Sequence, residues 1–191
     1  MCESCLRIVP PPVDFIKEYP LKSCIDFQGA LFVYTEDNVF ARLLHEVKYN
    51  FVEEAFEPFT ILFDSWYQQN VSFFQNIDVI VAVPLHPRRL AERGFNQSDF
   101  IAHMVANKTA QNVEKLLKRS RFTRPQVGLS QPDREKNVKD AFVLSGECTG
   151  KSILLVDDVF TTGSTVQSCA KVLKKNGARS VSVFTLARAI K

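Results

Sequence analysis

The feature that most constrains the fold is the segment ILLVDDVFTTGSTV, residues 153–166. Its four leading apolar residues, Ile153 to Val156, predict a short strand buried on both faces, as in parallel sheets. The acidic pair Asp157 and Asp158 follows directly, so both carboxylates should emerge at the carboxyl end of that strand. In open α/β sheets this edge is where ligands bind. The segment therefore predicts an α/β fold with a ligand site at residue 157 and beyond.

The hydroxyl-rich turn after the acidic pair predicts a phosphate site. Gly163 lies within it, immediately before a predicted helix at residues 164–176. Backbone amides at a helix N-terminus attract anions, and a glycine lets a phosphate approach closely. The acidic pair would accept hydrogen bonds from ribose hydroxyls, and Mg²⁺ would neutralise the remaining charge. The alternative is an ordinary strand, turn and Ser/Thr helix cap.

The rest of the chain alternates between strand and helix patterns. Strands are predicted at residues 30–34, 77–84, 113–117, 141–144 and 180–187, and helices at residues 38–49, 52–69 and 97–106. This order favours one Rossmann-like domain, with a parallel sheet flanked by helices and joined by right-handed crossovers. We assign residues 29–191 to it and residues 1–28, which are rich in cysteine and proline, to a small N-terminal module.

Positive charge is concentrated in one segment. Residues 116–139 contain seven Lys or Arg and two Asp or Glu, a net charge of 7 − 2 = +5 in a chain whose total is +3. Such a segment indicates either the phosphates of a small ligand or a nucleic-acid backbone, although it could be a solvated loop. Apolar stretches are short, none near the ~20 residues of a spanning helix, and we expect a cytoplasmic protein.

A second candidate segment is VAVPLHPRRLAERGFNQS, residues 81–98. It leaves a predicted buried strand and carries Arg88, Arg89 and Arg93 beyond a proline-bounded turn. Guanidinium groups bind diphosphate through paired hydrogen bonds. His86, between a leucine and a proline, is interpreted as a loop residue and not as an acid–base catalyst.

These motifs resemble known families. VDDVFTTGST is similar to the signature by which type I phosphoribosyltransferases bind phosphoribosyl diphosphate (PRPP). The long Arg-rich segment departs from the short loop of those enzymes and resembles the ComF family of competence proteins. Further similarity to ComF lies in LLHEVKY (43–49), KRSRFTRPQVGLS (118–130), REKNVKDAF (134–142) and NGARSVSVFTLAR (176–188).

The resemblance implies a type I phosphoribosyltransferase fold, with ribose hydroxyls held by Asp157 and Asp158, which would be the catalytic residues if transfer occurs. The implied PRPP-binding residues are Val156, Asp157, Asp158, Val159, Phe160, Thr161, Thr162, Gly163, Ser164 and Thr165. Candidate ligands of diphosphate or of a DNA backbone are Lys48, Arg88, Arg89, Arg93, Arg119 and Arg134. Asn96, Gln97, Gln126 and Asn137 also match the family, without an assigned role.

The implied function is to bind PRPP with Mg²⁺ together with single-stranded DNA during natural transformation. Helicase-like and recombination-mediator competence proteins are the implied partners. The alternative is an active type I phosphoribosyltransferase of nucleotide or base salvage. A PRPP-sensing regulator is a third reading, but the sequence lacks a helix-turn-helix pattern for duplex DNA.

The cysteines divide into two groups. Cys2 and Cys5 have the spacing of a zinc knuckle, and Cys24 offers a third thiolate, whereas ComF relatives carry four cysteines in this region. We leave open whether Zn²⁺ binds there, with a fourth ligand from His45 or water, or whether the module holds no metal. Cys148 and Cys169 are expected to be packing residues.

Overall fold

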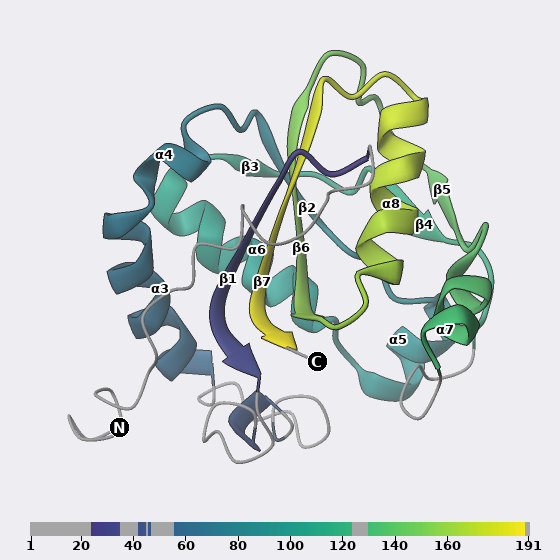
Figure 1. The fold of residues 1–191 in the computed structure, drawn as a ribbon, viewed down its shortest axis with the longest axis horizontal. Coiled ribbons are helices and arrows are strands. Elements are labelled where there is room, and N and C mark those ends of the chain that lie inside the picture. Colours follow the sequence, from purple (N-terminus) through teal and green to yellow (C-terminus); the bar gives the residue numbers. More distant parts are fainter. Residues whose placement is uncertain (1–23, 35–41, 45, 47–55, 124–129, 190–191) are drawn as a thin grey trace.

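The computed structural model describes residues 24–34, 42–44, 46, 56–123 and 130–189. Figure 1 shows an α/β domain in which a twisted sheet runs between two groups of helices. The strands are β1 (Phe27–Tyr34), β2 (Val79–Ala82), β3 (Asn112–Val113), β4 (Leu117–Arg119), β5 (Phe142–Leu144), β6 (Ser152–Phe160) and β7 (Ser180–Ala189). The helices are α3 (Glu57–Gln69), α4 (Val71–Phe74), α5 (Pro87–Arg93), α6 (Gln97–Thr109), α7 (Gln131–Val138) and α8 (Ser164–Lys175).

The described part of the chain forms one parallel sheet in the order β1-β7-β6-β2-β3. Every neighbouring pair in it is parallel, which confirms the predicted fold class. β6 lies at the centre, because its apolar first half pairs with both β7 and β2. All carboxyl ends therefore lie at one edge of the sheet, the lower edge in Figure 1.

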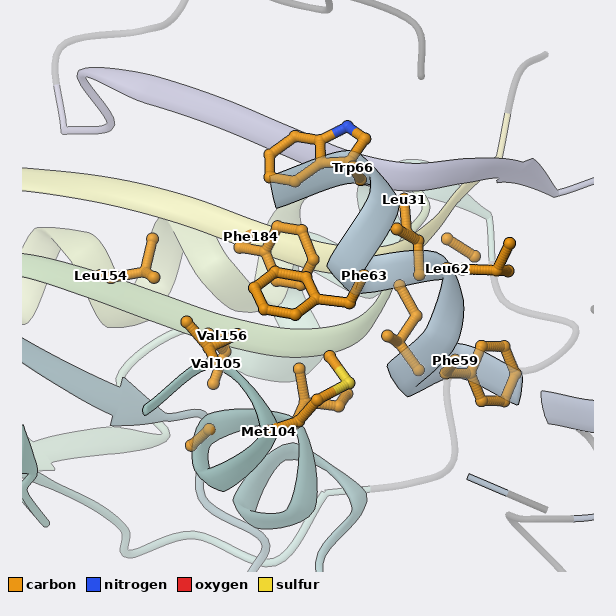
Figure 2. Close-up of a cluster of buried hydrophobic side chains, with 14 of the residues drawn as sticks. Leu31, Phe59, Leu62, Phe63, Trp66, Met104, Val105, Leu154, Val156 and Phe184 are labelled. Atoms are coloured by element: carbon orange, nitrogen blue, oxygen red, sulfur yellow. The ribbon is translucent and has the colours of Figure 1, made fainter. Parts of the chain in front are cut away.

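Each face of the sheet buries its own core. On one face, α3 and α6 pack their apolar sides against β6 and β7, and Figure 2 shows Phe63 of α3 against Phe184 of β7. Their ring centroids are 5.4 Å apart with an edge-to-face orientation. On the other face, α8 contributes Cys169 and Leu173 to a second core, which also contains Cys148. The expectation that both cysteines are packing residues is confirmed.

Three predicted elements differ from the structure. The strand expected at 113–117 splits, because the chain leaves the main sheet after β3, and β4 then pairs antiparallel with β5 as a separate two-stranded sheet. The predicted loop after β2 contains α5, whose first residue, Pro87, is favourable at a helix start. β6 continues to Phe160, four residues beyond the prediction, because β7 still pairs with it there.

Two further predictions concern the first third of the chain. The helix expected at 38–49 lies largely outside the described residues, although residues 42–44 and 46 are helical. Of the cysteine-containing module, only the last residues are described. Ile25 is buried in the second core, and the Asp26 amide donates to the Val181 carbonyl at 2.8 Å. No described helix has both the length and the apolar content required to span a membrane.

The first core generates a test of the fold. Phe63 is fully buried against rings of α3, α4 and β7, so Phe63→Ala should lower the free energy of unfolding by about 3–5 kcal/mol. Ile61, on the same helix, is 44% exposed, and Ile61→Ala should change the free energy of unfolding by less than about 0.5 kcal/mol. Urea denaturation of both variants measures the difference. Equal losses would contradict the described orientation of α3.

Candidate functional site

The site is built on the carboxyl half of β6. β2 pairs with β6 only as far as Ala82 opposite Val156, whereas β7 pairs with β6 through to Phe160. Asp157 and Asp158 therefore lie within the strand but beyond the point where β2 ends. Both side chains are half-buried. The acidic pair occupies the carboxyl edge of the sheet, where the sequence predicted it.

The segment after β2 returns to this edge and is bound to it by hydrogen bonds. The Val83 amide donates to the Val156 carbonyl at 2.9 Å, and the Asn96 side-chain amide donates to the Val83 carbonyl at 3.1 Å. Asn96 also caps α6, because its Oδ1 accepts from the Ser98 amide at 3.3 Å. The Ser98 hydroxyl then donates to Oδ1 of Asp157 at 3.0 Å. This relay, which we call the Asn96–Ser98–Asp157 link, joins the two candidate segments.

The turn between β6 and α8 is tightly packed and carries neighbouring hydroxyl groups. Gly163 precedes α8 with φ +75°, a left-handed conformation that favours glycine. A Cβ on Gly163 would lie 2.5 Å from Cζ of Phe160, whose ring packs directly beneath it. The hydroxyls of Thr162 and Ser164 are 2.7 Å apart. Small size at Gly163 and neighbouring hydroxyls at the first turn of α8 suit a phosphate group.

Arg119 supplies positive charge near the acidic pair. It ends β4, its guanidinium lies over the Phe142 ring at 5.3 Å, and it donates to the Thr123 hydroxyl. Burial lowers the pKa of Arg119, and the charge of Asp157 opposes this shift. Arginine stays protonated all the same. Burial and the nearby Asp157 raise the pKa of the Cys169 thiol well above its usual value, so Cys169 is neutral.

The other basic candidates lie in several settings. Arg88 and Arg89 are on α5, and both interact with Glu92, at 3.1 Å and 3.6 Å. Arg93, at the end of α5, donates to Oε1 of Gln97 at 2.7 Å. Arg134 lies in α7, and nothing is described of its side chain. Lys48 lies outside the described residues.

Gln97 is a polar side chain held in a buried position at the first turn of α6. It is 2% exposed, and its Nε2 has no hydrogen-bond partner among the described residues. A buried amide hydrogen without an acceptor costs free energy, so such a group is a candidate ligand contact. Its neighbours in sequence, Asn96 and Ser98, both belong to the link.

The candidate metal ligands are the cysteines near the N-terminus and the carboxylates of β6. Cys2 and Cys5 lie outside the described residues, and Cys24 is half-buried. Within the described ranges, no cluster of three or more His, Cys, Asp or Glu side chains could hold a metal ion. The carboxylates of Asp157 and Asp158 have the oxygen chemistry that Mg²⁺ prefers, and a metal carried by a phosphosugar needs few protein ligands.

Sequence patterns do not predict the role of Ser98, and they do not predict the packing of Phe160. Ser98 is separated from Asp157 by 59 positions, and only the adjacency of β2 and β6 brings them together. Its one sequence signal is the Asn-x-Ser spacing at a helix start. Phe160 was treated as part of the binding motif, but its ring is buried and supports the Gly163 backbone. Phe160 therefore supports the turn by packing its ring against the Gly163 backbone.

Comparison with known proteins agrees with this geometry. The phosphoribosyl transferase domain family matches residues 64–191. The DNA utilization protein YhgH of Escherichia coli strain K12 is 36% identical over 151 residues, which are 78% of this chain and 66% of that protein. Competence protein F of Haemophilus influenzae is 39% identical over 116 residues, 59% of this chain and 51% of the relative. The chain thus spans about half to two thirds of these relatives.

Among solved structures, adenine phosphoribosyltransferase from Leishmania tarentolae is similar with a TM-score of 0.45 and 11% identity, over 82% of this chain and 90% of that one. The domain match covers well over half of the chain and includes the whole carboxyl edge built by β2, β6 and α8. The chain belongs to the phosphoribosyl transferase domain family and, within it, to the ComF group of competence and DNA-utilization proteins.

Proposed function

We propose that this chain binds PRPP with Mg²⁺ at the carboxyl end of β6 and binds single-stranded DNA through the neighbouring basic elements. It would act in the cytosol during DNA uptake in natural transformation, with helicase-like and recombination-mediator competence proteins as partners. One observation carries the proposal: the Asn96–Ser98–Asp157 link joins the acidic end of β6 to the segment that follows β2 and contains the Arg-rich helix α5. The proposed phosphosugar site and the proposed cationic surface would therefore share one edge of the sheet.

The roles of the residues follow from their chemistry. The amides and hydroxyls from Thr161 to Thr165 would receive the 5′-phosphate at the N-terminus of α8, where the helix dipole favours an anion. Asp157 and Asp158 would accept hydrogen bonds from the ribose hydroxyls and share in holding Mg²⁺. When bound, the metal would neutralise diphosphate charge. The guanidinium groups of Arg88 and Arg89 would bind diphosphate or the DNA backbone.

The relatives' names support the DNA half of the proposal. One is a DNA utilization protein and the other a competence protein. Positive charge also supports it, because residues 116–139 carry a net +5. Lysine and arginine side chains bind nucleic acid by replacing the counterions of its phosphates.

A second candidate function is true phosphoribosyl transfer. It is favoured by the complete turn from Asp157 to Thr165, in which Gly163 has a left-handed conformation and packs too closely on Phe160 to carry a side chain. Such transfer depends mainly on positioning and charge stabilisation, and needs no side-chain nucleophile. Diphosphate release from PRPP, measured across the nucleobases, separates the two functions. Release that requires a base would make the protein an enzyme, and PRPP binding without release would leave it a binding protein.

The turn itself provides a first prediction. Gly163→Ala should weaken PRPP–Mg²⁺ binding by roughly tenfold to a hundredfold, because loss of a charge-assisted hydrogen bond costs about 1.5–3 kcal/mol. The added methyl group would displace Phe160 and the adjacent amides. Isothermal titration calorimetry measures the affinity.

A matched control is Gly150→Ala. Gly150 has φ +71°, nearly the same backbone conformation, but a Cβ there meets nothing within 4 Å, and the residue precedes the amino end of β6. In both variants the left-handed conformation should lower the free energy of unfolding by about 1–2 kcal/mol. Only Gly163→Ala should also lower the affinity for PRPP–Mg²⁺. Unchanged PRPP binding in Gly163→Ala would remove the turn from the proposed site.

The α5 arginines provide a second prediction. If Arg88 and Arg89 each contact one phosphate, the double variant Arg88→Ala, Arg89→Ala should reduce the slope of log K against log salt by about 1.4 for single-stranded DNA. Lys175→Ala is the control, because Lys175 is exposed at the far end of α8. Fluorescence anisotropy over a salt series measures both slopes. Equal slopes for the two variants would exclude α5 from the DNA interface.

A further inference from the structure

An exposed aromatic ring lies between basic side chains beside the candidate site. Phe122 follows β4 and is 44% exposed. The guanidinium carbon of Arg88 lies over its ring at 4.8 Å from the centroid, and the His86 ring meets it edge-on at 5.2 Å. We call these three residues, from segments about 35 positions apart, the Phe122 platform. In Figure 1, α5 lies toward the edge of the sheet where β6 ends.

The backbone around Phe122 is held on both sides. Arg121, which precedes it, donates to the carbonyls of Lys136 and Asn137 at 3.4 Å and 3.0 Å, and so binds the carboxyl end of α7. Thr123, which follows it, accepts from Arg119. Phe122 therefore stays at the surface while both neighbours are anchored, although burial would be favourable for a ring of this size.

The electrostatic surroundings favour a polyanion. Lys118, Arg121, Lys136 and Lys139 are exposed on the adjoining elements, and the side chain of Arg88 is 68% exposed. Within α5, Arg88 forms an i, i+4 ion pair with Glu92 at 3.1 Å. Exposed pairs of this kind contribute little stability, so a phosphate can replace the carboxylate at small cost.

An exposed ring with an arginine over it, on a surface rich in lysine and arginine, matches one ligand chemistry closely. Single-stranded nucleic acid offers unstacked bases for aromatic rings and phosphates for lysine and arginine. The bases of a duplex are already stacked on each other, and a small anion has no aromatic face to stack on a phenyl ring. Arg119 relates the platform to the proposed phosphosugar site. It donates a hydrogen bond to Thr123, the residue after Phe122, and its charge interacts with those of Asp157 and Arg89.

We propose that Phe122, with Arg88 and His86, stacks on one unpaired base of single-stranded nucleic acid bound beside the phosphosugar site. This proposal rests on the DNA-binding half of the proposed function and specifies its contact surface. The ring supplies sequence-tolerant stacking, while Arg88 lies over the ring and its charge can exchange Glu92 for a phosphate. His86 orients the ring and caps α5, since its Nδ1 accepts from the Arg88 amide at 3.2 Å.

The test compares two oligonucleotides of equal length and charge, oligo-dT and its fully abasic analogue, by fluorescence anisotropy. Phe122→Ala should weaken oligo-dT binding by about tenfold or more, the usual effect of removing a stacking aromatic. Its salt slope should stay that of the wild type, because no charge is lost. Binding of the abasic strand should be unaffected. Phe122→Trp should keep or increase the affinity for oligo-dT.

The matched control is Phe27→Ala, which removes an exposed phenyl ring, 49% exposed, at the amino end of β1. Circular dichroism checks that all variants fold alike. Equal oligo-dT affinity in Phe122→Ala and Phe27→Ala would overturn the platform while leaving the DNA-binding function intact. Wild-type binding of duplex DNA as tight as that of oligo-dT would also overturn it. Absence of any wild-type binding to oligo-dT would reject both the platform and the DNA-binding function.

Discussion

The parallel pairing of β2 with β6 is the constraint on which the candidate site depends. These strands are separated in the chain by α5, α6 and the β4–β5 sheet, yet Val79–Ala82 pairs directly with Ile153–Val156. Both strands therefore release their following segments at one edge. The Asn96–Ser98–Asp157 link then fixes those segments to each other. Without this pairing, the acidic strand end and the Arg-rich segment would be independent features, each with an ordinary structural explanation.

Much of the fold was predictable because it depends on local patterns. The continuous apolar run at 153–156 indicated a strand buried on both faces, and Gly163 with its hydroxyl neighbours marked the start of α8. The β3–β4 region could not be predicted in the same way. Residues 113–117 are apolar enough for one strand, but their partners are distant, and only pairing with β5 shows that the chain leaves the main sheet. The contact between Ser98 and Asp157 was hidden for the same reason.

The arginines near the site have different packing environments. Arg119 packs on Phe142, and its positive charge interacts with the carboxylate of Asp157. Arg88 and Arg89 lie on the outer helix, paired only with Glu92 among the ion pairs of the described residues. In the sequence, all three are candidate ligands of diphosphate or DNA. Their contacts separate them, since Arg119 packs on Phe142 and Thr123 while Arg88 and Arg89 pair with Glu92, and these contacts depend on tertiary packing that a charge count does not reveal.

The central claim, that the turn at Gly163 receives the phosphosugar, is tested most directly by NMR of protein labelled with ¹⁵N-glycine. PRPP–Mg²⁺ should shift the amide resonance of Gly163, at the N-terminus of α8, in a saturable manner. The amides of Gly150 and Gly177 lie at the amino edge of the sheet, where the Gly150 amide donates to the Gly177 carbonyl at 2.8 Å, and their resonances should not move. A saturable shift confined to Gly150 and Gly177, or an unmoved Gly163 at saturating PRPP, would contradict the account.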